Sequence, residues 1–207
     1  MDLVINYLAE HWVEVAGAIL SFIYLYLSIN QKIGLWIFGF LCSALYVVVF
    51  FQSKFYAGMT LQLYYLGVSI YGWLTWKRGK QVTGNDLPVI HIPKSMILDV
   101  LAVFLVIFIL YFFVLSNFTD SPVPRADSFT TALSIIATWM LARKMIENWL
   151  LFIVADGVCT GLYFYRELYP TAILFAVYTI MAIIGYFKWK RTMNREWQAK
   201  LRKKEIF

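Results

Sequence analysis

An acidic residue stands in the middle of an apolar stretch of the chain, and polar and aromatic residues precede it at helical spacing. Asn148, Phe152 and Asp156 are four residues apart, so a helix would place them on one face. A carboxylate at the centre of a bilayer costs about 2.5 kcal/mol or more unless it faces a polar cavity or a partner. This face therefore indicates either a solute-binding site or hydrogen bonds that join neighbouring helices.

A second polar face lies earlier in the chain. Gln62 is followed at three- or four-residue steps by Tyr65, Ser69 and Trp73. Hydrogen bonding between membrane helices is the alternative interpretation of Gln62. Aromatic faces attract cations, a carboxylate complements positive charge, and amides can bind a carboxamide or hydroxyls. The two faces together predict a site for a small, polar, aromatic solute that can carry positive charge.

The composition predicts an all-α integral membrane protein. Of the 207 residues, 61% are hydrophobic and 14% are charged, whereas soluble domains average about 25% charged. A spanning helix needs roughly 20 mostly apolar residues. We expect one membrane domain over residues 1–207, with polar loops at 77–94 and 116–128. Seven spans are predicted, of which the fifth is short: Val13–Ile29, Gly34–Phe51, Gly58–Trp76, Met96–Leu115, Phe129–Leu141, Trp149–Tyr165 and Tyr169–Trp189.

The distribution of lysine and arginine predicts the orientation. With the N-terminus outside, fifteen of these residues lie on the inner side and only Lys54, Arg125 and Arg166 lie outside. Cytoplasmic loops carry the excess of positive charge in membrane proteins, so we expect a cytoplasmic C-terminus. The basic tail at 192–207 is interpreted either as solvated or as docked on anionic lipid.

The two halves of the chain resemble each other when they are aligned at an offset of 113 residues, without a gap. Each third helix of the proposed repeat also ends alike, as GWLTWKR in the first half and GYFKWKR in the second. We therefore expect a duplication with repeat one at about 12–78, a linking helix at about 95–116 and repeat two at about 127–191. Three helices, a connecting helix and three more helices give a 3+1+3 arrangement of parallel repeats. Matched pairs include Trp36 and Trp149, Trp76 and Trp189, Gly72 and Gly185, Tyr56 and Tyr169, Tyr65 and Tyr178, and the polar pair Ser43 and Asp156.

Enzymatic chemistry is not expected. The chain has two histidines, two cysteines in separate apolar runs and no recognisable catalytic or metal-binding motif, so neither a cofactor nor a metal is predicted. The net charge of +6 is explained by the cytoplasmic excess of basic residues and does not indicate nucleic acid. Trp12, Trp76 and Trp189 fit an interfacial aromatic belt.

Specific motifs in both halves resemble the Pnu vitamin transporter family. They are IENW at Ile146–Trp149, Asp156 after it, LQLYY at Leu61–Tyr65 and YGW at Tyr71–Trp73. The similarity covers nearly the whole chain outside the termini and the 77–94 loop. One departure is Phe152, where the family commonly has tryptophan, so a stacking face is kept and an indole N–H is lost.

The resemblance implies a SWEET-like fold and a homotrimer in the bacterial inner membrane. It also implies facilitated diffusion of nicotinamide riboside for NAD biosynthesis, with trapping by a cytoplasmic riboside kinase. Thiamine or another vitamin is the alternative substrate, and a non-transporting membrane scaffold is an alternative function. The expected substrate-binding residues are Trp36, Ser43, Gln62, Tyr65, Trp73, Lys144, Glu147, Asn148, Trp149, Phe152, Asp156 and Tyr178.

Overall fold

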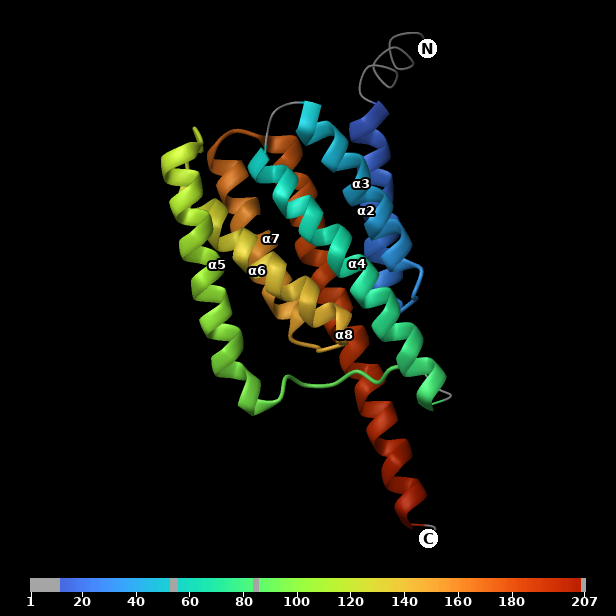
Figure 1. Cartoon of the computed structure of the whole chain (residues 1–207). Coiled ribbons are helices and arrows are strands. Elements are labelled where there is room, and N and C mark those ends of the chain that lie inside the picture. Colours follow the sequence, from blue (N-terminus) through green and yellow to red (C-terminus); the bar gives the residue numbers. More distant parts are fainter. Residues whose placement is uncertain (1–11, 53–55, 84–85, 206–207) are drawn as a thin grey trace. The chain divides into compact units, whose positions relative to one another are not determined.

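The computed structural model describes residues 12–52, 56–83 and 86–205 and is almost wholly helical over these ranges (Figure 1). A helix lies at each of the seven predicted positions. Their bounds are α2 Trp12–Ile29, α3 Leu35–Gln52, α4 Tyr56–Thr83, α5 Ile97–Phe118, α6 Pro124–Ala142, α7 Asn148–Tyr165 and α8 Tyr169–Glu205, with a 3-10 turn η1 at Lys94–Met96.

The chain divides into two compact units, Met1–Lys77 and Arg78–Phe207. In the first unit, α2 packs against α3, and α3 meets α4 through the edge contact of Trp36 with Trp76. In the second unit, α5 packs on α6, α6 on α7, and α7 on α8. Each unit is therefore built from helices that contact their neighbours in the sequence.

A glycine lies under a tryptophan ring in both units. In the first unit, a methyl group on Gly72 of α4 would overlap the ring of Trp36. The Trp36 and Trp76 rings meet edge to face, with ring centres 5.7 Å apart and an angle of 90° between their planes. In the second unit, a methyl group on Gly185 of α8 would come within 2.7 Å of Trp149. The ring centres of Trp149 and Trp189 lie 5.6 Å apart, and the ring planes meet at 83°. Residues 113 apart thus make the same contacts.

The turn that precedes each of these tryptophans is also built twice. Gln31 and Lys144 both have φ of 54°, a left-handed conformation that is uncommon outside glycine. The amide after Gln31 donates to the carbonyl of Leu27, and the amide after Lys144 donates to that of Met140. These six-to-one bonds define a Schellman motif that ends α2 and α6. The duplicated sequence therefore produces duplicated local structure.

Two predictions about tryptophan and one about a loop are wrong. Trp76 and Trp189 are 4% and 0% exposed, so they are buried between helices and not placed in an aromatic belt. The side chain of Trp12 lies outside the described residues. The helix α4 continues to Thr83, into the predicted 77–94 loop, because KRGKQVT contains no proline to end it.

The helix α6 explains why the fifth span looked short. It begins at Pro124, a residue favoured in the first turn of a helix, and carries Arg125 and Asp127 there. Ten of its nineteen residues are buried, and it contacts both α5 and α7. A helix covered by its neighbours can contain serine and threonine, such as Ser128, Thr130 and Thr138, without exposing them to lipid.

Four helices in the described ranges are long and apolar enough to cross a membrane. They lie at Leu35–Gln52, Lys94–Phe118, Asn148–Tyr165 and Tyr169–Ala199, while Ala16–Ile29 is a shorter apolar helix. The Lys94–Phe118 span has a mean hydropathy of 3.0 and its side chains are mostly exposed. Exposed side chains of this kind require a hydrocarbon environment or a further protein surface.

We predict that Gly72→Ala and Gly185→Ala each lower the stability of the protein by about 1–3 kcal/mol, because the added methyl group forces the tryptophan ring out of place. The loss would be measured as a lower thermal midpoint of the purified protein in detergent. Gly157→Ala is the matched control, since a methyl group at Gly157 meets no atom within 4 Å. Equal midpoints for all three variants would contradict the proposed packing role.

Candidate functional site

The turn between α6 and α7 gathers the charged and polar residues that open the predicted solute-binding face. Arg143 stacks its guanidinium 4.6 Å from the centre of the Trp139 ring, and Lys144 takes the left-handed conformation that ends α6. The Lys144 side chain is only 2% exposed. The matching position in the first unit is the uncharged Gln31, so the turn itself does not require a cation.

Burial lowers the pKa of Lys144 from its ordinary value to about 8, because the ammonium group loses hydration. The carboxylates of Asp86 and Glu196 act in the opposite direction and favour the charged form. Lys144 is therefore mostly charged at physiological pH, but it loses its proton at a lower pH than a solvated lysine does. A lysine of this kind can respond to a nearby anion or solute more readily than a solvated one.

The first two residues of α7 are buried and each keeps one polar atom without a partner. Asn148 is fully buried, and its amide nitrogen donates to the carbonyl of Met145. Its Oδ1 and the indole Nε1 of Trp149 have no hydrogen-bond partner among the described residues. Buried polar atoms are nearly always satisfied, so these two atoms are candidates to bind a solute or ordered water.

The rest of the predicted face continues along α7. The Phe152 ring lies 6.5 Å from the Trp149 ring, and the half-buried Asp156 follows one turn later. On α8, Tyr178 makes an edge contact with Phe175, whose ring stacks on Tyr163 at 5.3 Å. The second unit therefore supplies a helix face that combines an amide, aromatic rings and a carboxylate.

The first unit holds the remaining predicted residues on α3 and α4. Trp36 and Ser43 on α3 are buried, at 1% and 5% exposure. Trp36 Nε1 also lacks a hydrogen-bond partner among the described residues. On α4 the side chains of Gln62, Tyr65 and Trp73 are half-buried, and Tyr65 lies against Tyr64 with ring centres 5.5 Å apart.

Glu147 differs from the other predicted site residues, because both of its carboxylate oxygens are engaged by the chain between α4 and α5. His91 Nδ1 lies 2.7 Å from Oε1, and the Ile92 amide donates to Oε2 at 3.0 Å. Sequence reasoning did not anticipate these contacts. The partners are 55 and 56 residues away from Glu147, and no spacing rule connects residues across such a distance.

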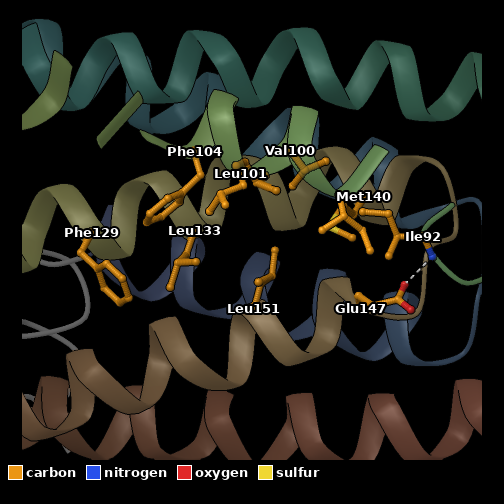
Figure 2. Close-up of a pocket in the computed structure, with 11 residues that line it drawn as sticks. Ile92, Val100, Leu101, Phe104, Phe129, Leu133, Met140, Glu147 and Leu151 are labelled. Carbon is orange, nitrogen blue, oxygen red and sulfur yellow. Dashed lines mark hydrogen bonds between the residues drawn. The ribbon is translucent and has the colours of Figure 1, made fainter. Parts of the chain in front are cut away.

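A groove of about 440 Å³ lies between α5, α6 and α7 (Figure 2). Apolar side chains such as Phe104, Leu133 and Met140 form most of its wall, and Glu147 is its acidic member. A polar solute in this groove would lose hydrogen bonds to water and gain few in return. The groove is therefore suited to hydrocarbon and not to the polar solute that the α7 face predicts.

The fold and the α7 face define an all-α, multi-pass membrane protein with a polar and aromatic helix face in its second unit. A family model described as "Nicotinamide mononucleotide transporter" matches residues 11–191. The chain belongs to this family, so it is a membrane transport protein, and its predicted membership of the Pnu transporters is confirmed.

Curated relatives and a crystal structure agree with the family match. The nicotinamide riboside transporter PnuC of Escherichia coli K12 is 26% identical over 86% of this chain and 84% of its own length. The riboflavin/roseoflavin transporter RibM of Streptomyces davaonensis is 24% identical over 89% of this chain and 87% of its own. A crystal structure of the vitamin B3 transporter PnuC matches with a TM-score of 0.72 and 21% identity, covering 94% of this chain and 87% of that one.

We predict that burial of Lys144 makes stability depend on pH. Below about pH 8 the folded and unfolded states both hold the proton, and the folded state carries the cost of burying the charge. As the pH rises from about 8 towards 10.5, the unfolded state binds more protons than the folded state, so stability increases. The expected increase is about 1–3 kcal/mol.

Lys144→Gln introduces the residue that the first unit uses at the matching position. We expect the thermal midpoint of this variant to vary less between pH 8 and pH 10 than that of the parent protein, since the buried proton is gone. Parallel pH profiles of the two proteins in the same detergent would show that Lys144 does not titrate in this range.

Proposed function

We propose that the chain carries nicotinamide riboside across the bacterial inner membrane by facilitated diffusion. The observation that carries the proposal is the pair of buried, unpartnered polar atoms at the start of α7, Asn148 Oδ1 and Trp149 Nε1. An amide acceptor and an indole donor beside aromatic rings suit a carboxamide-bearing aromatic cation. Relatives named as nicotinamide riboside transporters support this choice of substrate.

Departures from the repeat support a binding role for the second unit. Leu35 occupies the position that matches Asn148, and it is equally buried, so packing alone would accept an apolar residue there. At the position of Asp156 the first unit has Ser43, so the difference there is a carboxylate in place of a hydroxyl. Asn148 is thus a polar residue at a position that the first unit fills with an apolar one. Residues that break a pattern without structural necessity are candidates for function.

In the proposed mechanism, two three-helix repeats and the linking helix α5 form a 3+1+3, SWEET-like fold. Rocking of one repeat against the other would open a midplane site alternately to each side. The N-terminus would be outside and the C-terminus in the cytoplasm, in accordance with the distribution of lysine and arginine. The active form is proposed to be a homotrimer. A cytoplasmic riboside kinase would trap the solute by phosphorylation.

The proposed solute contacts come from both repeats. In the second repeat, Asn148 and Trp149 would bind the polar edge of the ring, Phe152 would stack on it, and Asp156 would complement its positive charge. Contacts from the first repeat would be made by Gln62 and its neighbours on α4. The remaining proposed residues are Trp36, Ser43, Tyr65, Trp73, Lys144 and Tyr178.

A riboflavin-like vitamin is the second candidate substrate, because a riboflavin/roseoflavin transporter is similar over 89% of this chain. Competition binding separates the candidates. Nicotinamide riboside should displace labelled ligand at lower concentration than thiamine or riboflavin, and the reverse order would replace the proposed substrate. If none of the three vitamins raised the thermal midpoint of the purified protein, a membrane scaffold would be favoured instead.

We predict that Asp156→Asn and Gln62→Ala each weaken nicotinamide riboside binding by about tenfold, since each removes one charged or hydrogen-bonded contact worth roughly 1.4 kcal/mol. Titration calorimetry on the purified variants measures the effect. Asp99→Asn is the matched control for loss of a carboxylate, because Asp99 lies exposed in the first turn of α5, outside the proposed site. Unchanged affinity in both site variants would refute the assignment.

A coupled transporter would use Asp156 to carry a proton. Facilitated diffusion instead predicts that uptake into vesicles is the same with and without a pH or sodium gradient. Stimulation of uptake by an inward proton gradient, lost in Asp156→Asn, would contradict facilitated diffusion.

A further inference from the structure

The chain between α4 and α5 is fastened to the turn between α6 and α7. The amide of Ile90 donates to the carbonyl of Lys144 at 3.0 Å, and the amide of Ile146 donates to the carbonyl of Ile90 at 2.9 Å. These two bonds form an isolated parallel bridge between Ile90 and Met145. The connecting chain is thus held by main-chain bonds at the residues that precede α7.

Glu147 adds two side-chain bonds next to this bridge. Its Oε1 lies 2.7 Å from His91 Nδ1 and its Oε2 accepts the amide of Ile92 at 3.0 Å. The Glu147 side chain is 23% exposed and that of His91 is 66% exposed. Figure 2 shows the Glu147 to Ile92 bond at one end of the apolar groove. We call these four bonds the connector latch.

The first unit shows that the turn does not need this carboxylate. Gly34 stands at the position that matches Glu147, and Gln31 at the position of Lys144. Even so, the amides of Leu35, Trp36 and Ile37 make the same turn bonds as their counterparts Asn148, Trp149 and Leu150. The carboxylate of Glu147 therefore has a role only in the second unit, where it contacts His91 and Ile92.

The latch acts directly beside the proposed solute contacts. Glu147 immediately precedes Asn148 and Trp149, whose unpartnered atoms carry the proposed function. A shift of the α7 start by a fraction of an ångström would move both atoms, because a rigid helix transmits displacement of its first turn. The main-chain bridge and Glu147 hydrogen-bond the connector to this point, and Ile92 also packs on the apolar cluster that contains Met145.

We infer that Glu147 is a positioning residue for transport and not a ligand of the solute. Together with His91 it clamps the α4–α5 connector onto the α6–α7 turn and so fixes Asn148 and Trp149 for binding. This inference rests on the proposed function of the α7 face. It assigns to His91, which lies outside the predicted site, a measurable influence on that site.

The latch is tested by hydrogen exchange on the full chain in detergent, without any solute. Glu147→Ala removes both side-chain bonds and His91→Ala removes one of them, so peptides covering residues 86–96 should exchange several-fold faster in each variant. Glu167→Ala is the matched control for loss of a glutamate, because Glu167 is exposed in the turn that follows α7. Unchanged exchange in Glu147→Ala would overturn the latch.

Binding of nicotinamide riboside then separates positioning from direct contact. We expect Glu147→Ala to weaken binding about fivefold and His91→Ala to weaken it by no more than that, with the double variant equal to Glu147→Ala, since His91 acts through Glu147. Weakened binding in Glu147→Ala without faster exchange over residues 86–96 would make Glu147 a solute ligand and refute the inference. If the unmodified chain bound no nicotinamide riboside, the exchange result would still report the latch, and only the proposed function would fail.

Discussion

The packing of an indole ring onto a glycine of the facing helix determines the geometry of both units. Trp36 on Gly72 and Trp149 on Gly185 bring two helices together closely, and Trp76 and Trp189 support each ring from its edge. Membrane helices gain little from hydrophobic segregation, so close packing at small residues is a main source of their association. The polar residues of the α7 face begin at one of these rings, and their positions depend on it.

Much of this arrangement was predictable from the sequence, and the errors have definite physical causes. The offset of 113 residues identified the tryptophan and glycine pairs, and the left-handed turns follow the same offset. The belt assignment of Trp76 and Trp189 failed because nearby lysines and arginines resemble a membrane interface, whereas the burial of each ring depends on the residue facing it. The contact between His91 and Glu147 was unpredictable, since hydrophobic periodicity carries no information about a loop that packs on a distant turn.

The two units repeat the same turns and ring contacts but differ in the polarity of several matched residues. Equivalent turns and ring contacts are kept, while Gly34, Leu35 and Ser43 in the first unit correspond to Glu147, Asn148 and Asp156 in the second. Burying Asn148 in place of a leucine has a cost in desolvation. That cost falls on a helix start where Trp149 packs on Gly185 and the preceding turn is hydrogen-bonded to the connector.

The length of α8 has a separate consequence for how the protein presents its C-terminus. The helix runs without a break for 37 residues and so measures about 55 Å, whereas the hydrocarbon core of a bilayer is about 30 Å thick. The residues predicted as a basic tail from 192 onward continue this helix as far as Glu205. A protein domain joined to this end would be held by a rigid helix and not by a flexible linker. Its distance and orientation relative to the last membrane-embedded turn would therefore be fixed.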